Sequence, residues 1–145
     1  MTLGTYPDGV TGPFLQAALF VERVLHERDG VLSFVRIVDR LAVQAHGDAP
    51  EELPEGATAK VTLVVMLKSG DARGRHRLLV RPELPSGLSL EPRGFDVLFE
   101  GEDRGVNVIV ELDVALMEGL HWFTVSLGDV ELTRVPLRIA YQRLT

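Results

Sequence analysis

The four histidines of the chain are far apart in the sequence and form no motif. They are His26, His46, His76 and His121. Histidine metal sites usually take two ligands from a short motif such as HxH or HExxH, and neither occurs here. We expect His121 to have a structural role at the start of a strand, and His76 to lie in a basic strand. The histidines therefore predict neither a metal site nor a catalytic base.

The serines and the glycine-rich segments also lack a catalytic pattern. The candidate nucleophiles are Ser33, Ser69, Ser86, Ser89 and Ser126. None lies in a GxSxG or SxxK motif, whose neighbouring groups would activate the hydroxyl. Residues 70–74 contain two glycines but lack the lysine and serine of a P-loop, so they predict a turn. The chain has no cysteine, which excludes thiolate catalysis and disulfides. We expect no catalytic residue, no cofactor and no resident metal.

The acidic loops are the best candidates for binding a small ligand. Glu100, Glu102 and Asp103 cluster in one loop, and Asp71 lies in another. Calcium takes roughly six to eight oxygen ligands, which loops at the tip of a β-sandwich can supply. Solvated turn charges are the simpler interpretation, since Arg104 is next to the carboxylates. Binding of calcium, carbohydrate or lipid through the loops is therefore the alternative function.

The basic side chains do not predict a nucleic-acid site. Arg73, Arg75, Arg77 and Arg81 form the basic stripe, but no aromatic platform accompanies it and the net charge is −6. The N-terminus shows no signal peptide, and no apolar run approaches the length of a membrane span. We therefore expect a cytoplasmic protein with neither nucleic acid nor membrane as its partner.

These residues must be positioned by strands, because apolar residues recur with a period of two along most of the chain. Residues 106–116 and 95–99 both alternate, and we expect them to form a hairpin linked through residues 102–105. Residues 60–68 are apolar on both faces, which predicts a strand in the interior of a sheet. Residues 47–56 predict a solvated acidic loop.

Residues 14–27 fit either a strand or a helix. Several apolar residues have helical spacing, Pro13 suits a helix start and Gly30 a helix end. However, Asp29-Gly30 is also a strong hairpin turn, and residues 31–43 are rich in β-branched residues. We favour two long strands, with a helix over residues 14–27 as the alternative.

Residues 119–142 predict a second hairpin, with a turn at Gly128-Asp129. A two-residue loop without a bulge would place Phe123 and Val135 on opposite faces. We therefore predict either a three-residue loop or a bulge near Arg134, which also places His121 beside Leu137. Pro136 cannot donate a hydrogen bond to a ladder, so it marks the last strand as an edge.

Several segments between residues 14 and 141 carry a family resemblance. They are FLQAALFVERVL, DGVLSFVRIVDRLAV, KVTLVVMLKSGDARG, FDVLFEGEDRGVNVIVEL, EGLHWFTVSL and TRVPLRI. They resemble a bacterial domain-of-unknown-function family of small immunoglobulin-like β-sandwich proteins. The resemblance implies that fold, and it implies no activity and no site residues.

We therefore predict one domain over residues 1–145, with residues 1–12 as a loose N-terminal arm. Its fold is all-β: a two-layer antiparallel β-sandwich, immunoglobulin-like, with seven to nine strands and little or no helix. An open sandwich has strand edges that can dock another chain. The predicted function is a non-catalytic interaction or scaffold module of a bacterial cytoplasmic assembly, with a protein partner or self-association.

Overall fold

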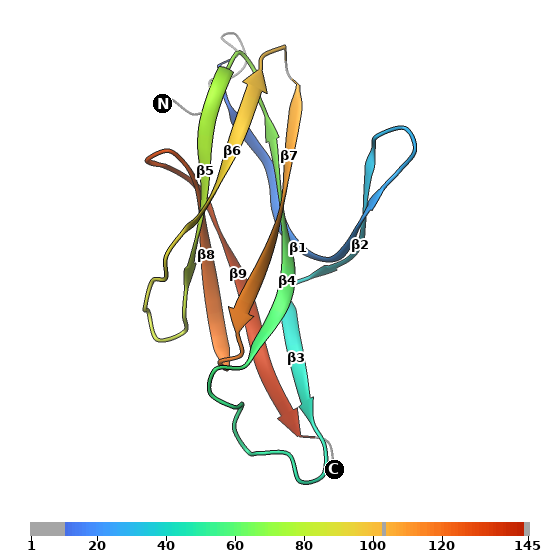
Figure 1. The fold of residues 1–145 in the computed structure, drawn as a ribbon, viewed down its shortest axis with the longest axis vertical. Coiled ribbons are helices and arrows are strands. Elements are labelled where there is room, and N and C mark those ends of the chain that lie inside the picture. The colour runs from blue at the N-terminus through green and yellow to red at the C-terminus, as the bar shows by residue number, and fades with distance from the viewer. Residues whose placement is uncertain (1–10, 103, 144–145) are drawn as a thin grey trace.

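Nine strands in two sheets make up the computed structural model, which describes residues 11–102 and 104–143 (Figure 1). The all-β prediction is confirmed, and the helical alternative for residues 14–27 is wrong. No helix in the described part of the chain is long and apolar enough to cross a membrane. Residues 1–10, most of the expected N-terminal arm, lie outside the described residues. The strands are β1 (Phe14–His26), β2 (Leu32–Val38), β3 (Arg40–Ala45), β4 (Thr58–Lys68), β5 (Arg73–Glu83), β6 (Arg93–Glu100), β7 (Gly105–Ala115), β8 (Gly119–Leu127) and β9 (Val130–Arg143).

The strand order of the two sheets is immunoglobulin-like. Sheet A has the order β2-β1-β4-β7, and sheet B has the order β3-β9-β8-β5-β6. The sets β1-β4-β7 and β9-β8-β5 correspond to strands A-B-E and G-F-C of an immunoglobulin-like sandwich. The neighbouring strands are antiparallel, apart from β3 and β9, which are parallel.

The core lies between the sheets and accounts for the period-two pattern. The Phe20 ring of β1 meets the Phe123 ring of β8 edge to face, with centroids 5.0 Å apart. As predicted, β4 is an interior strand, paired with β1 on one side and β7 on the other. Its residue Val64 is fully buried on the outer face, opposite Leu19 and Ile109.

The expected hairpin between residues 95–99 and 106–116 is wrong. β6 pairs with β5 in sheet B, whereas β7 pairs with β4 in sheet A. The connection between β6 and β7 therefore crosses from one layer to the other, and it turns at Gly101 and Glu102, whose φ angles are 75° and 57°. A period of two shows which face of a strand is buried, but it does not show which sheet the strand joins.

Residues 31–43 also differ from the prediction of one long strand. The structure divides them at Asp39, so that β2 belongs to sheet A and β3 to sheet B. The Asp39 carbonyl accepts a hydrogen bond from the amide of Arg138 at 3.2 Å, which ties the crossing to β9. Apolar residues continue on both sides of this crossing, so the sequence pattern gave no sign of the break.

The hairpin of β8 and β9 contains the predicted bulge. Phe123 pairs with Val135 and His121 with Leu137, and the register shifts by one residue next to Val125. The loop itself has two residues, so the three-residue alternative is wrong. The prediction that the last strand is an edge is correct only for the part of β9 around Pro136, which pairs with β8 alone. Residues 138–143 of β9 also pair with β3 and therefore lie inside the sheet.

Candidate functional site

The structure keeps the four histidines apart. His121 is buried, and its Nε2 lies 2.7 Å from the Met117 carbonyl. The His76 ring packs edge to face on Phe99, and His26 and His46 are exposed. Within residues 11–102 and 104–143, no three His, Asp or Glu side chains lie close enough together to hold a metal ion.

Ser69 is the one candidate serine with a fully buried side chain among those described. Its hydroxyl lies 3.0 Å from the Gly101 carbonyl and 2.9 Å from the Arg104 carbonyl. Both partners are hydrogen-bond acceptors rather than general bases that would deprotonate the hydroxyl. Ser69 therefore fastens the end of β4 to the connection between β6 and β7.

The acidic loops and the basic stripe partly neutralise one another. Glu100 lies 3.4 Å from Arg104, and Glu102 lies 4.0 Å from Arg73. Arg77 of the stripe is paired with Asp96 at 3.0 Å. Asp103 lies outside the described residues. Carboxylates that already face guanidinium groups are less suited to bind calcium.

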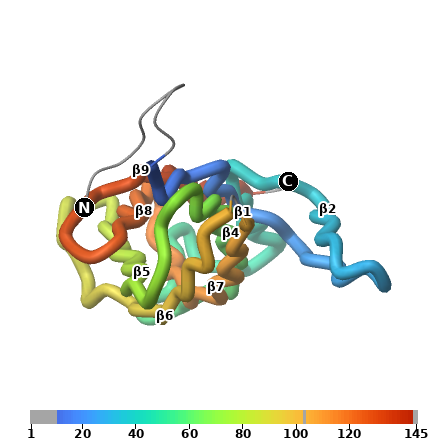
Figure 2. The backbone as a smooth tube through the Cα atoms, turned by 90° about the horizontal axis from the view of Figure 1, so that it is seen from above, coloured from blue at the N-terminus to red at the C-terminus, as the bar shows by residue number. Residues whose placement is uncertain are grey.

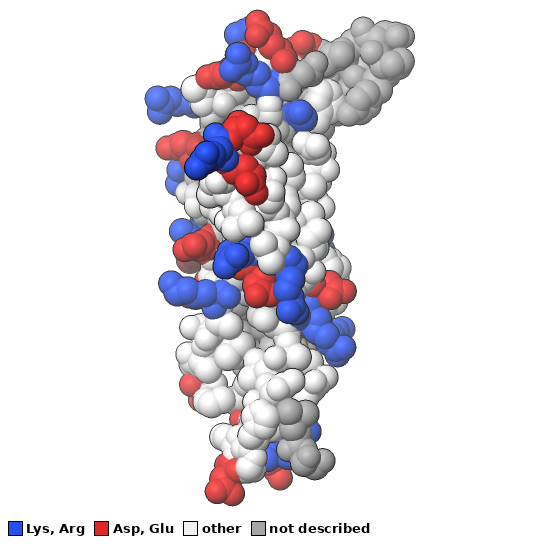
Figure 3. All heavy atoms as spheres, turned by 90° about the vertical axis from the view of Figure 1, so that its right-hand side faces the viewer, with Lys and Arg blue, Asp and Glu red and all other residues white. Residues whose placement is uncertain are grey.

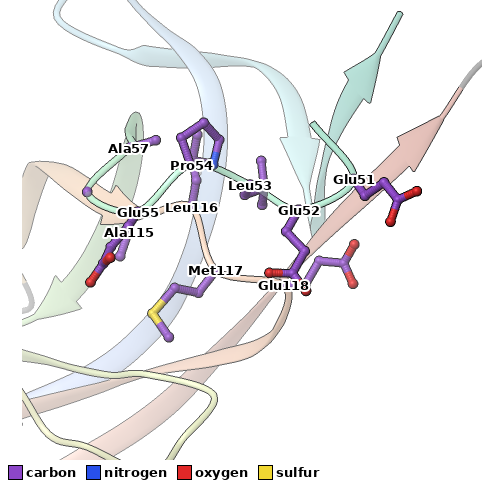
Figure 4. A pocket seen from close by; sticks show the side chains of 11 residues that line it. Glu51, Glu52, Leu53, Pro54, Glu55, Ala57, Ala115, Leu116, Met117 and Glu118 are labelled. Atoms are coloured by element: carbon purple, nitrogen blue, oxygen red, sulfur yellow. The ribbon is translucent and has the colours of Figure 1, made fainter. Parts of the chain in front are cut away.

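A cavity of about 530 Å³ lies between residues 51–57 and the connection from β7 to β8 (Figure 4). Four glutamates line it together with apolar side chains. Figure 4 shows the Glu55 carboxylate on one side, apart from those of Glu51, Glu52 and Glu118. Glu118 Oε1 also accepts a hydrogen bond from the Tyr141 amide at 3.1 Å. The acidic groups therefore do not converge on one point.

The most distinctive surface is the outer part of the β1–β2 hairpin, residues 22–38, which we call the projecting hairpin. It extends well beyond the side of the sandwich (Figures 1 and 2). Its tip is the predicted Asp29-Gly30 turn: the Gly30 amide donates to the Glu27 carbonyl at 3.0 Å, and the Val31 amide donates to Asp29 Oδ1 at 3.1 Å. Gly30 has a φ of 84°, as a glycine readily allows.

Both faces of the projecting hairpin carry apolar side chains. Val24 pairs with Phe34 and His26 with Leu32 on one face, while Val35 lies on the opposite face. Ile37 is 67% exposed and Val31 59% exposed. None of the large apolar side chains of the hairpin belongs to the core cluster or packs against it, apart from Val38 at its base. Those outside the core are Val24, Leu25, Val31, Leu32, Phe34, Val35 and Ile37.

Charges are few on the outer strand of this hairpin. β2 carries one charged residue, Arg36, and its guanidinium lies 3.0 Å from the Glu22 carboxylate of β1. Figure 3 looks onto this side of the molecule and shows a long uncharged surface broken by small clusters of both signs. This surface was not predicted from the sequence, although the segment LSFVRIV has the high β-propensity and low charge that mark an unprotected strand.

Comparisons with known proteins leave the family open. No family model matches the chain, so membership of the expected family stays a prediction. No curated protein is significantly similar to it in sequence. Among solved structures, an immunoglobulin-like protein from Pseudomonas aeruginosa is similar, with a TM-score of 0.42 and 12% sequence identity, over 89% of this chain and 97% of that chain. The fold assignment made above rests on the strand order of the two sheets.

Proposed function

We propose that this chain is a non-catalytic protein-interaction module of a bacterial cytoplasmic assembly, and that the projecting hairpin is its docking element. The observation that carries the proposal is the set of apolar side chains on a hairpin that extends away from the core. Apolar surface in contact with water costs about 25 cal/mol per Å², and exposed apolar patches commonly mark interfaces. A binding partner that covers the hairpin removes this cost.

The residues that could do chemistry support a non-catalytic function. Ser69 and His121 are buried, and their polar atoms contact backbone carbonyls rather than each other or a cavity. The carboxylates of the acidic loop lie beside arginines. No specific observation favours the small-ligand alternative over docking through the hairpin.

The proposal is tested by photo-crosslinking in the host cell. A photoreactive amino acid is placed at Ile37, on the hairpin, or at Leu98, on β6. Leu98 is the matched control because it is also an apolar strand residue with a large exposed fraction, 53% against 67% for Ile37. We expect discrete crosslinked products from position 37 and few from position 98. Equal crosslinking at both positions, or none at position 37, would show that the hairpin is not a docking element.

A further inference from the structure

We propose that the hairpin docks onto a second copy of the same chain, through antiparallel pairing of two β2 strands about a two-fold axis at Ser33. This inference rests on the proposed function and specifies its partner. The pairing would join the two copies of sheet A into one continuous eight-stranded sheet, since sheet A contributes four strands from each copy. An isologous contact of this kind closes on itself and gives a dimer.

The edge of β2 is the least protected edge of the described sheets. The other free edges belong to β7, β3 and β6. At the edge of β7, an Arg93 guanidinium nitrogen donates to the Glu111 carbonyl, so a side chain already occupies this backbone group. β6 carries Arg93, Asp96 and Glu100. β3 is one residue shorter than β2, and its exposed side chains are Arg40, Ala42 and Gln44, none of which is a large apolar one. Charges, short strands and covering side chains are the usual protection against strand addition, and β2 has the least of them.

The segment from Val31 to Val35, which is the first four residues of β2 and the residue before it, matches itself when it is reversed about Ser33. In this register Leu32 lies opposite Phe34 of the second copy, and Val31 lies opposite Val35, each pair occurring twice. Leu32 and Phe34 share one face of the hairpin, and Val35 lies on the other. Val31 continues the alternation on the face of Val35, because the Glu27 amide donates to its carbonyl at 3.0 Å and so extends the ladder by one residue. Arg36 lies outside the matched segment. This suits its φ of 55°, which interrupts the regular strand at that point.

The charges of the hairpin favour a copy of itself over a strongly charged partner. Residues 22–40 contain four acidic residues and four arginines, so this region is neutral and the net charge of −6 lies elsewhere in the chain. The acidic residues are Glu22, Glu27, Asp29 and Asp39, and the arginines are Arg23, Arg28, Arg36 and Arg40. Reversal about Ser33 places the tip, with Arg28 and Asp29, beside the base of the other hairpin, with Arg36 and Asp39. Charges of both signs therefore meet at each end of the junction.

Sedimentation analysis of the full chain over about 1–200 µM tests the dimer, because a short strand junction should bind only weakly. We expect a reversible monomer–dimer equilibrium. Val35→Lys places a charge opposite Val31 of the second copy and should raise the dissociation constant at least about tenfold. Leu98→Lys, on the edge strand β6, should leave it unchanged. Thermal unfolding of both variants verifies that they are folded.

The two-fold axis is tested separately by a disulfide. The chain has no cysteine, so Ser33→Cys introduces a single thiol, and the axis places it opposite itself in the dimer. We expect mild oxidation to link this variant into a covalent dimer. Ser33 is half-buried, whereas Ser89 is exposed and lies outside β2. Ser89→Cys is therefore the control and should stay monomeric.

The outcomes separate this inference from the proposed function. A chain that is monomeric at about 200 µM, or a dimer that resists Val35→Lys and does not crosslink through Ser33→Cys, overturns the self-pairing. If position 37 nevertheless crosslinks to a different protein in the host cell, the docking function stands while the second-copy inference fails. If position 37 gives no crosslink to any chain, both fail.

Discussion

The Ser69 hydroxyl lies between two backbone carbonyls that are 32 and 35 residues further along the chain. Ser69→Ala should lower the free energy of unfolding by about 0.5–1.5 kcal/mol, the usual net contribution of one hydrogen bond, because the hydroxyl donor is lost. Neither carbonyl is left unpaired, since the Ser69 amide still donates to the Arg104 carbonyl at 2.9 Å and the Arg104 amide to the Gly101 carbonyl at 3.1 Å. Urea unfolding measures the change.

Ser126→Ala is the control for this prediction. Ser126 lies half-buried on β8, and its hydroxyl has no hydrogen-bond partner within the described residues. Its removal should change stability by less than about 0.5 kcal/mol. If Ser126→Ala costs as much as Ser69→Ala, the hydroxyl of Ser69 does not fasten the two connections together.

The roles of single residues could be predicted only in part from the sequence. The absence of a catalytic motif around the serines and histidines was visible, because such motifs are local. The partners of Ser69 were not, because a connection in the other half of the chain supplies them. The exposure of Ile37 could not be predicted either, because it depends on how far the hairpin extends beyond the sandwich, which the local sequence does not determine.

At the scale of the elements, apolar side chains in the core strands stabilise the folded monomer, whereas we expect those of the projecting hairpin to contribute little to its stability. Phe123 is 1% exposed and contacts Phe20 across the sheets, whereas Phe34 lies outside the core cluster. Phe123→Ala should cost about 3–5 kcal/mol, as is usual for a buried aromatic ring. Phe34→Ala should cost less than about 1 kcal/mol in the monomer.

Urea unfolding at low protein concentration compares the two truncations, so that association does not contribute to stability. Each variant is the control for the other, because both replace a phenylalanine by alanine and differ only in where the ring lies. Similar costs would mean that the projecting hairpin is part of the folding core, and the reason for assigning its apolar side chains to a partner would disappear.

The period-two pattern predicted the elements better than their arrangement. The bulge in β8–β9 followed from the sequence because Phe123 and Val135 must both face the core. The crossing between β6 and β7 did not, because a hairpin and an inter-sheet connection bury the same alternate residues. The break at Asp39 was also not predicted, because β2 and β3 are both apolar strands. Which sheet each strand joins depends on the strand it pairs with, β1 for β2 and β9 for β3.

At the scale of the whole molecule, the net charge is −6, but no three acidic or histidine side chains among the described residues lie close enough together to hold a cation. Adding about 1 mM calcium in place of EDTA should therefore shift the unfolding temperature by less than about 1 °C, since only a ligand that binds the folded state raises it. Differential scanning fluorimetry measures the shift, with magnesium as the control for ionic strength. A rise of several degrees with calcium, absent in Glu102→Gln, would instead assign a calcium site to the loop after β6.

The two ends of the projecting hairpin are anchored in different layers. β1 continues into sheet A, where it is paired with β4, and the chain after β2 passes through Asp39 into sheet B, where β3 runs parallel to β9. A force that pulls on the tip of the hairpin is therefore transmitted to two ladders, β1–β4 in sheet A and β3–β9 in sheet B.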